Sequence, residues 1–279
     1  MPLPRAIRQL MHRRIVLVAA GVLGVIAVLA LAAPWVTAFD PHDTAVLQRL
    51  KSPTAEHLLG TDELGRDLFS RIVFGARYSL AIAAFTALGA VVCGTVLGLV
   101  AGFFRRLDAP LMRVVDAMMS LPDILLAIAL VAILGPSLAN VVLALVLVYT
   151  PRVARVVRAS TLVLRELLFI EAVRALGVRT SRILWRHILP HLMSPILVQL
   201  SFIFAYAILA EAGLSFLGVG VSPDTPTWGT MVAGSQPYAH QAFWVVLFPG
   251  LAIIFTALSL QLLGDGVRDL LDPKLKKVG

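Results

Sequence analysis

Long runs of uncharged residues are the feature that most limits what this chain can fold into. Three have no charged residue and a fourth has a single carboxylate, Glu211; the runs are residues 15–38, 80–104, 243–263 and 194–217. The hydrocarbon core of a bilayer is about 30 Å thick, which an α-helix of about 20 apolar residues crosses. Each run is long enough, so we expect four transmembrane helices from these segments alone.

Composition supports the same interpretation. The chain is 59% hydrophobic and 14% charged, whereas soluble domains are roughly 45–50% apolar and about 25% charged. So few charged residues cannot cover the surface of a 30 kDa globule, and the remaining apolar surface must face lipid. The lone cysteine, Cys93, rules out an intramolecular disulfide, and we expect it to be a small core residue.

A fifth run, residues 124–150, is interrupted in its middle by Gly135-Pro136-Ser137. Proline removes a backbone donor, so we expect two helices, 114–134 and 137–150, the second extending into the cytoplasm. The distribution of Lys and Arg favours this hairpin: with six spans, 19 of 24 lie on one side, in segments 1–14, 105–113, 151–193 and 264–279. Basic loops face the cytoplasm. The sequence therefore predicts an all-α polytopic membrane protein with six transmembrane helices and cytoplasmic termini.

The two remaining loops, 39–79 and 218–242, are then extracytoplasmic. Within the first, apolar positions at helical spacing over residues 65–74 predict an amphipathic helix lying in the membrane interface. The first apolar run is longer than the 7–15 residues of a signal peptide, so we expect a retained helix. The net charge of +8 then orients the chain and contacts anionic lipids, and nucleic acid is not expected as a partner.

No residue pattern supports catalysis. No lysine follows a glycine, so a phosphate-binding Gly-Lys loop is absent from the sequence, as are HExxH and GxSxG motifs. His187 and His191 have the spacing of two metal ligands, but we expect Pro190 to break the helix between them. We therefore expect a non-catalytic chain that binds no metal or cofactor itself.

The segment 151–193 contains the most informative local pattern. Residues 171–176 favour a short helix, Gly177 is a helix-ending residue, and a second amphipathic stretch runs to Pro190. A helix–glycine–helix unit of this kind suits docking to a partner protein. It also suits a basic helix lying on lipid headgroups, and the residues alone favour neither.

These residues resemble a known family. Segment 171–190 is similar to the EAA loop, E-A-A-x3-G-x9-I-x-L-P, of inner-membrane permease subunits of bacterial ABC importers, with Val173 and His187 departing from the pattern. The His-Ile-Leu-Pro ending resembles the dipeptide/oligopeptide/nickel branch, and the chain looks like its second, "C"-type permease. Five further stretches point the same way: residues 57–67, 75–80, 211–218, 226–229 and 264–274.

The resemblance implies an inner-membrane importer with several partners. A homologous second permease would complete the pathway, and two cytoplasmic ATPases would bind ATP and Mg²⁺. An extracytoplasmic binding protein would deliver the substrate. Small peptides are the first expectation for this substrate, and nickel or glutathione-like solutes are the alternatives. It also implies which residues contact the ATPases: Glu171, Ala172, Arg174, Ala175, Gly177, Leu189 and Pro190. The rival hypotheses are a stand-alone secondary transporter or channel, which predicts several buried ionisable groups, and a membrane-embedded enzyme.

Several other residues could have a structural or a functional role. Glu211 either contacts the pathway or a charged end of the substrate, or is capped by backbone donors around Gly213 or paired across the subunit interface. Gly213 and Phe216 are candidates for the same pathway or interface. Asp116 and Asp123 are expected to be structural, with Asp123 pairing a loop arginine. Three more positions, Arg152, Arg155 and Arg158, are expected to be orientation anchors. Trp228 is expected at the membrane interface, or else against a binding protein.

Overall fold

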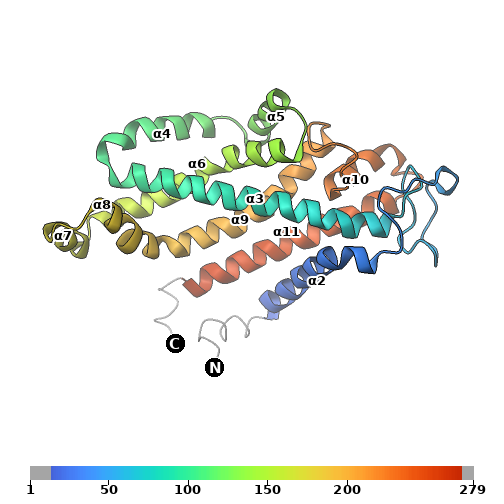
Figure 1. Ribbon diagram of the computed structural model, residues 1–279, viewed down its shortest axis with the longest axis horizontal. Helices are drawn as coiled ribbons and strands as arrows, with labels where there is room; N and C mark the ends of the chain where they lie inside the picture. The colour runs from blue at the N-terminus through green and yellow to red at the C-terminus, as the bar shows by residue number, and fades with distance from the viewer. Residues whose placement is uncertain (1–13, 272–279) are drawn as a thin grey trace.

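Five long helices run side by side along the long axis of the molecule in the computed structural model, which describes residues 14–271 (Figure 1). They are α2 (Arg14–Val36), α3 (Leu68–Phe103), α6 (Leu138–Arg165), α9 (Leu189–Phe216) and α11 (Trp244–Leu271). The helix α3 packs against α6 and α9, α9 packs against α11, and α11 packs against α2. The predicted all-α fold is confirmed, and no strand occurs within residues 14–271.

The predicted single helix 114–134 is wrong. The chain forms α4 (Arg105–Met119) and α5 (Asp123–Leu134), which meet at 92°. Pro122 stands at this break, where its missing N–H cannot continue the helix. Five described helices are long and apolar enough to span a bilayer, or six if the bent pair forms one span. The break at Gly135-Pro136 separates α5 from α6, as the sequence indicated.

The expected interfacial helix at residues 65–74 is instead the first part of α3, continuous with the apolar run at 80–104. The Asp67 side chain accepts a hydrogen bond from the Ser70 backbone N–H at 2.8 Å and caps the helix. Ser70 and Arg71 are buried. The polar face of this segment therefore packs inside the protein, and its expected position on lipid headgroups is incorrect.

Shorter elements gather at the two ends of the bundle (Figure 1). One end carries α7 (Leu168–Ala175) and α8 (Thr180–Arg182), and the other carries α10 (Trp228–Ser235) and residues 39–67. Two 3₁₀ turns, Val46–Gln48 and Gln236–Tyr238, complete the second end. The first residue of α2 and the last of α11 point toward the α7 end. Residues 1–13 and the expected solvated tail at 272–277 lie outside the described residues.

Glycines on α3 allow it to lie close to α6. A Cβ added at Gly94, Gly98 or Gly102 would lie 2.5–2.6 Å from atoms of α6. Small residues at four-residue spacing permit such close helix packing in membranes. The opposite side of α3 exposes apolar residues, among them Phe85 and Val92, as expected for a lipid-facing surface. Cys93 is exposed too, so its expected place in the core is wrong.

Candidate functional site

The short helix α7 ends as the sequence predicted, at Gly177. Gly177 has a φ of +75°, in the left-handed region that glycine enters without strain. Its N–H donates to the Arg174 carbonyl at 2.9 Å, and the Val178 N–H donates to the Val173 carbonyl at 3.3 Å. These two bonds form a Schellman motif, which satisfies the last carbonyls of the helix. The turn therefore sets the direction in which the chain leaves α7.

Helix α7 projects from one end of the bundle (Figure 1). Ile170 is fully buried, whereas Glu171, Ala172 and Ala175 are exposed. Arg174 is folded back, with its guanidinium 4.8 Å from the centroid of the Phe103 ring. Around this helix, Leu168, Leu176 and Trp185 expose 81%, 82% and 62% of their surface. An apolar and largely uncovered surface therefore surrounds the exposed predicted contact residues.

The second half of the loop differs from the expectation that Pro190 interrupts it. Residues 180–216 form one continuous helical span, in which Ile183–Ile188 is a π-helix. The wider turn places the backbone so that the Leu189 N–H donates to the Leu184 carbonyl, just before Pro190 removes a donor. Leu189 is half-buried and Pro190 is exposed at the start of α9. Within residues 14–271, His187 and His191 belong to no group of three metal-binding side chains.

Glu211 lies in a closed polar cluster between α9 and α10. It is 1% exposed, and its Oε1 accepts hydrogen bonds from the Ser215 hydroxyl at 2.9 Å and the Thr227 hydroxyl at 2.7 Å. A Cβ at Gly229 would come within 3.1 Å of both carboxylate oxygens. Hydroxyl donors thus hold Glu211, where the sequence had suggested backbone donors near Gly213. Phe216, at the end of α9, is 47% exposed.

Trp228 is a core residue, so neither expectation for it holds. It is 1% exposed, its indole Nε1 donates to the Ile72 carbonyl at 3.0 Å, and its backbone N–H donates to the Ser79 hydroxyl at 3.1 Å. Thr227 caps α10 through a capping box with Thr230. Together, Thr227 and Trp228 lock α10 onto α9 and α3. The partner of Glu211, Thr227, was missed because sixteen residues separate the two.

Three arginines of α6 pair with aspartates of α4 and α5. Arg152 lies 3.0 Å from Asp123, Arg155 lies 2.7 Å from Asp116, and the Arg158 Nη2 lies 2.7 Å from Asp108. The predicted pairing of Asp123 with an arginine is thus found, and the arginines that were expected to be orientation anchors also pair with aspartates of their own chain. Spacing was the available signal, because the arginines recur every three residues and the aspartates every seven or eight. We call these six residues the charge ladder.

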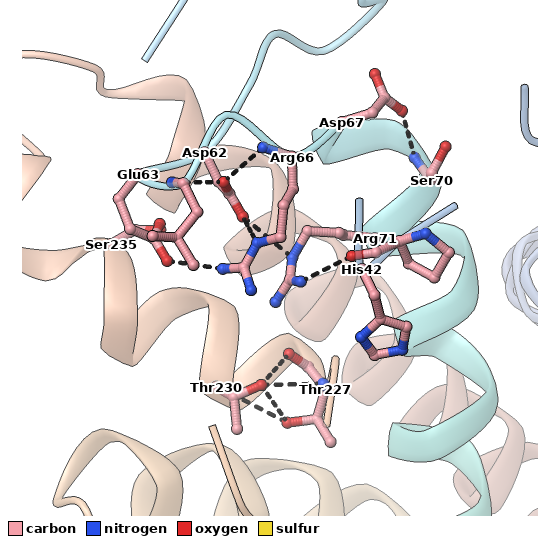
Figure 2. A network of polar contacts seen from close by, with 12 residues as sticks. His42, Asp62, Glu63, Arg66, Asp67, Ser70, Arg71, Thr227, Thr230 and Ser235 are labelled. Carbon is pink, nitrogen blue, oxygen red and sulfur yellow. Dashed lines mark hydrogen bonds and ion pairs between the residues drawn. The ribbon is translucent and has the colours of Figure 1, made fainter. Parts of the chain in front are cut away.

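A second charged network lies at the end of the bundle opposite α7 and is shown in Figure 2. Asp62, 2% exposed, accepts hydrogen bonds from the Arg66 Nε at 2.6 Å and the backbone N–H groups of Leu64 and Arg66. The Arg71 Nε lies 3.3 Å from the same carboxylate, and its Nη1 donates to the Pro41 carbonyl. Arg66 also binds Glu63 at 2.9 Å. This network ties residues 39–67 to the start of α3.

Comparison with known proteins extends these observations. The family model for the binding-protein-dependent transport system inner membrane component matches residues 94–277, and that for the N-terminal transmembrane domain of oligopeptide transport permease C matches residues 2–53. The chain is 48% identical to a putative peptide transport system permease protein of Brucella suis biovar 1, covering 100% of this chain and 94% of that one.

Two further similarities agree with this. The chain is 44% identical to the dipeptide transport system permease protein DppC of Alkalihalophilus pseudofirmus, covering 99% of this chain and 91% of the relative. Its fold is similar to a chain of the inward-facing MetNI methionine ABC transporter, with a TM-score of 0.60, 20% identity, and coverage of 74% of this chain and 98% of the other. The protein therefore belongs to the bacterial inner-membrane permease components of binding-protein-dependent ABC importers.

Proposed function

We propose that this chain is the C-type permease of a peptide importer and that α7 transmits the movements of a cytoplasmic ATPase. The relatives are named for peptide and dipeptide transport, which supports small peptides as substrate. An extracytoplasmic binding protein delivers the peptide, and a homologous second permease completes the pathway. The chain itself is non-catalytic and needs no cofactor of its own, because ATP and Mg²⁺ bind to the ATPases.

The observation that carries this proposal is the projecting α7 with its uncovered apolar surroundings. Leu168 begins α7 and Leu176 follows its last residue; each is more than 80% exposed, and the helix extends beyond the bundle (Figure 1). Large apolar side chains gathered on one exposed surface indicate a protein or membrane contact. Glu171 lies in the first turn of α7, where its negative charge suits the positive end of the helix dipole and is free to meet a basic group of the ATPase.

The same arrangement supports the predicted orientation. The first turn of α2 and the last turn of α11 face the end of the molecule that carries α7 (Figure 1). The segments at this end are rich in arginine and lysine, and segment 151–193 alone contains eight arginines. Because basic segments favour the cytoplasmic side, we place both termini and α7 there, and residues 39–67 with α10 outside.

Reconstitution tests this function. The purified chain alone is expected to hydrolyse no ATP, because it has no Gly-Lys phosphate loop. Adding the second permease and the ATPases should produce ATP hydrolysis in proteoliposomes. The peptide-loaded binding protein should raise that rate and drive uptake of radiolabelled dipeptide. ATP turnover by the isolated chain, or a complete complex that takes up no peptide, would contradict the proposal.

A further inference from the structure

The charge ladder lies at the cytoplasmic end of the span formed by α6. Arg152 closely follows the uncharged residues 138–150 of this helix, and basic residues that follow an apolar run favour the cytoplasmic side. The side chains of Arg152 and Asp123 are 39% and 47% exposed, and those of Arg155 and Asp116 are 49% and 64% exposed. Exposed charges at this end of a span face water, lipid headgroups or a polar partner.

Helices α2, α3 and α11 carry an exposed apolar surface that suits contact with lipid. Exposed side chains of α2, α3 and α11 are mostly large and apolar, with Val25, Phe85 and Phe255 each at least half exposed. In Figure 1, α2 forms the lower edge of the bundle, whereas α4 and α5 form the upper edge. The ladder joins α6 to α4 and α5 and therefore places exposed charges on the side of the bundle away from α2.

A cavity of about 220 Å³ opens beside the first pair of the ladder. Its lining combines the Asp123 carboxylate with two tyrosines, Tyr149 of α6 and Tyr206 of α9, and with the apolar Leu145 and Leu209. At about 30 Å³ per water molecule, the cavity holds roughly seven waters, which suits one end of a small peptide.

The aromatic rings are arranged around the cation. The Arg152 guanidinium carbon lies 5.3 Å from the Tyr206 ring centroid and 5.9 Å from that of Tyr149. Aromatic faces within about 6 Å attract cations, whether guanidinium or ammonium. Asp123 accepts only one hydrogen bond from a described side chain, that of Arg152 at 3.0 Å. Nearly half of the carboxylate side chain is exposed, so it has room for a second donor.

We propose that Asp123, Arg152, Tyr149 and Tyr206 form a subsite on the translocation pathway for the charged ends of a peptide. The peptide ammonium binds Asp123 and the face of Tyr206, while the carboxylate of the peptide binds Arg152. The ladder offers three cations and three anions, so a zwitterion exchanges partners from pair to pair. This inference rests on the proposed peptide transport, which it deepens by naming the wall of the pathway.

Cysteine protection in the complete transporter tests the subsite. In a Cys93→Ser background, Leu209→Cys places a thiol in the lining of the cavity, at a residue that is 48% exposed and uncharged. A water-soluble, charged thiol reagent should label it, whereas Phe255→Cys on the apolar face should stay unlabelled. Millimolar Ala-Ala should slow labelling at position 209, and N-acetyl-Ala-Ala-amide, which lacks both charges, should not.

Variants of the subsite then separate binding from structure. Asp123→Asn should raise the Ala-Ala concentration that protects Leu209→Cys by about tenfold, as expected for losing one charge-assisted hydrogen bond. Tyr206→Ala should weaken protection and Tyr206→Phe should preserve it, because the ring face remains. Phe85→Ala removes an aromatic ring on the apolar face that is 62% exposed, against 45% for Tyr206; it serves as the control and should leave protection unchanged.

Three results would overturn this assignment: no labelling at position 209, equal protection by both peptides, and protection by neither. Absence of labelling at position 209 would mean that another protein chain, such as the second permease, covers the ladder. Equal protection by both peptides, or by neither, would mean that charged termini are not recognised. The last arm separates the two proposals: protection by Ala-Ala in a complex that transports no peptide would keep the subsite and refute peptide import.

Discussion

Asp62 shows how the setting of a single charge decides its contribution to stability. It is buried and contacts two arginines, so replacing it leaves Arg71 as a buried cation without its carboxylate (Figure 2). Removing one partner of a buried pair costs about 3–5 kcal/mol. Exposed pairs contribute about 0–1 kcal/mol, and Asp116 with Arg155 is such a pair.

We therefore expect Asp62→Asn to lower the thermal unfolding midpoint strongly and Asp116→Asn to change it little. Both variants remove one negative charge from an aspartate–arginine pair, and they differ mainly in burial. Circular dichroism melts of the two purified variants in matched lipid nanodiscs provide the measurement. Equal shifts in the two melts would mean that burial does not set the strength of the Asp62 network.

The pair α3 and α6 carries a prediction at the scale of elements. A Cβ at Gly98 would lie 2.6 Å from the Ala154 carbonyl oxygen and 2.7 Å from the Val157 Cβ. Gly98→Ala should therefore force the helices apart and cost about 1–3 kcal/mol. Gly21→Ala on α2 is the matched control, since nothing lies within 4 Å of its added Cβ. A gain in helix propensity of up to about 1 kcal/mol is expected there. If both variants have the same unfolding midpoint, the contact does not limit the packing.

Helix α7 carries the prediction on coupling. Gly177→Val places a β-branched residue at φ +75°, which costs about 1–2 kcal/mol, although no neighbouring atom would meet its Cβ. The strain is confined to the backbone of the turn after α7, so we expect the variant to assemble with the other subunits. We expect it to take up less peptide per ATP hydrolysed, because the direction of the chain after α7 changes. Gly177→Asn should recover part of the loss, because asparagine tolerates the left-handed region. Arg179→Ala, at an exposed position, is the control. Normal coupling in Gly177→Val together with loss of coupling in Arg179→Ala would mean that another part of the loop, and not the end of α7, transmits the movement.

The orientation of the whole molecule can be tested with single cysteines. On a Cys93→Ser background, cysteines at positions 55 and 225 should react with an impermeant thiol reagent added outside intact cells. A cysteine at position 180, next to α7, should react only after the membrane is opened. The expectation follows from the excess of Lys and Arg in the segments assigned to the cytoplasm. Labelling of position 180 from outside would reverse the proposed orientation.

The elements that the sequence alone determined depend on residues close together in the chain. Long apolar runs predict the spans because the thickness of the bilayer sets their length. The ends of α5 and α7 follow from Gly135-Pro136 and Gly177, whose backbone preferences are local. Segment 171–190 was likewise recognisable as a pattern within twenty residues. All these signals act over a few turns of helix, which is why they could be interpreted before the fold was known.

Tertiary structure decided what lies opposite each polar side chain. Partners in the charge ladder are separated by 29, 39 and 50 residues, and their pairing depends on the 92° bend between α4 and α5. The same holds for Trp228, whose indole reaches a carbonyl 156 residues earlier, and for Arg71, which is buried by the loop before it. Helical periodicity shows that one face of a segment is polar. Whether that face meets water, lipid or another helix is set by packing between distant segments, and so only the folded chain determines it.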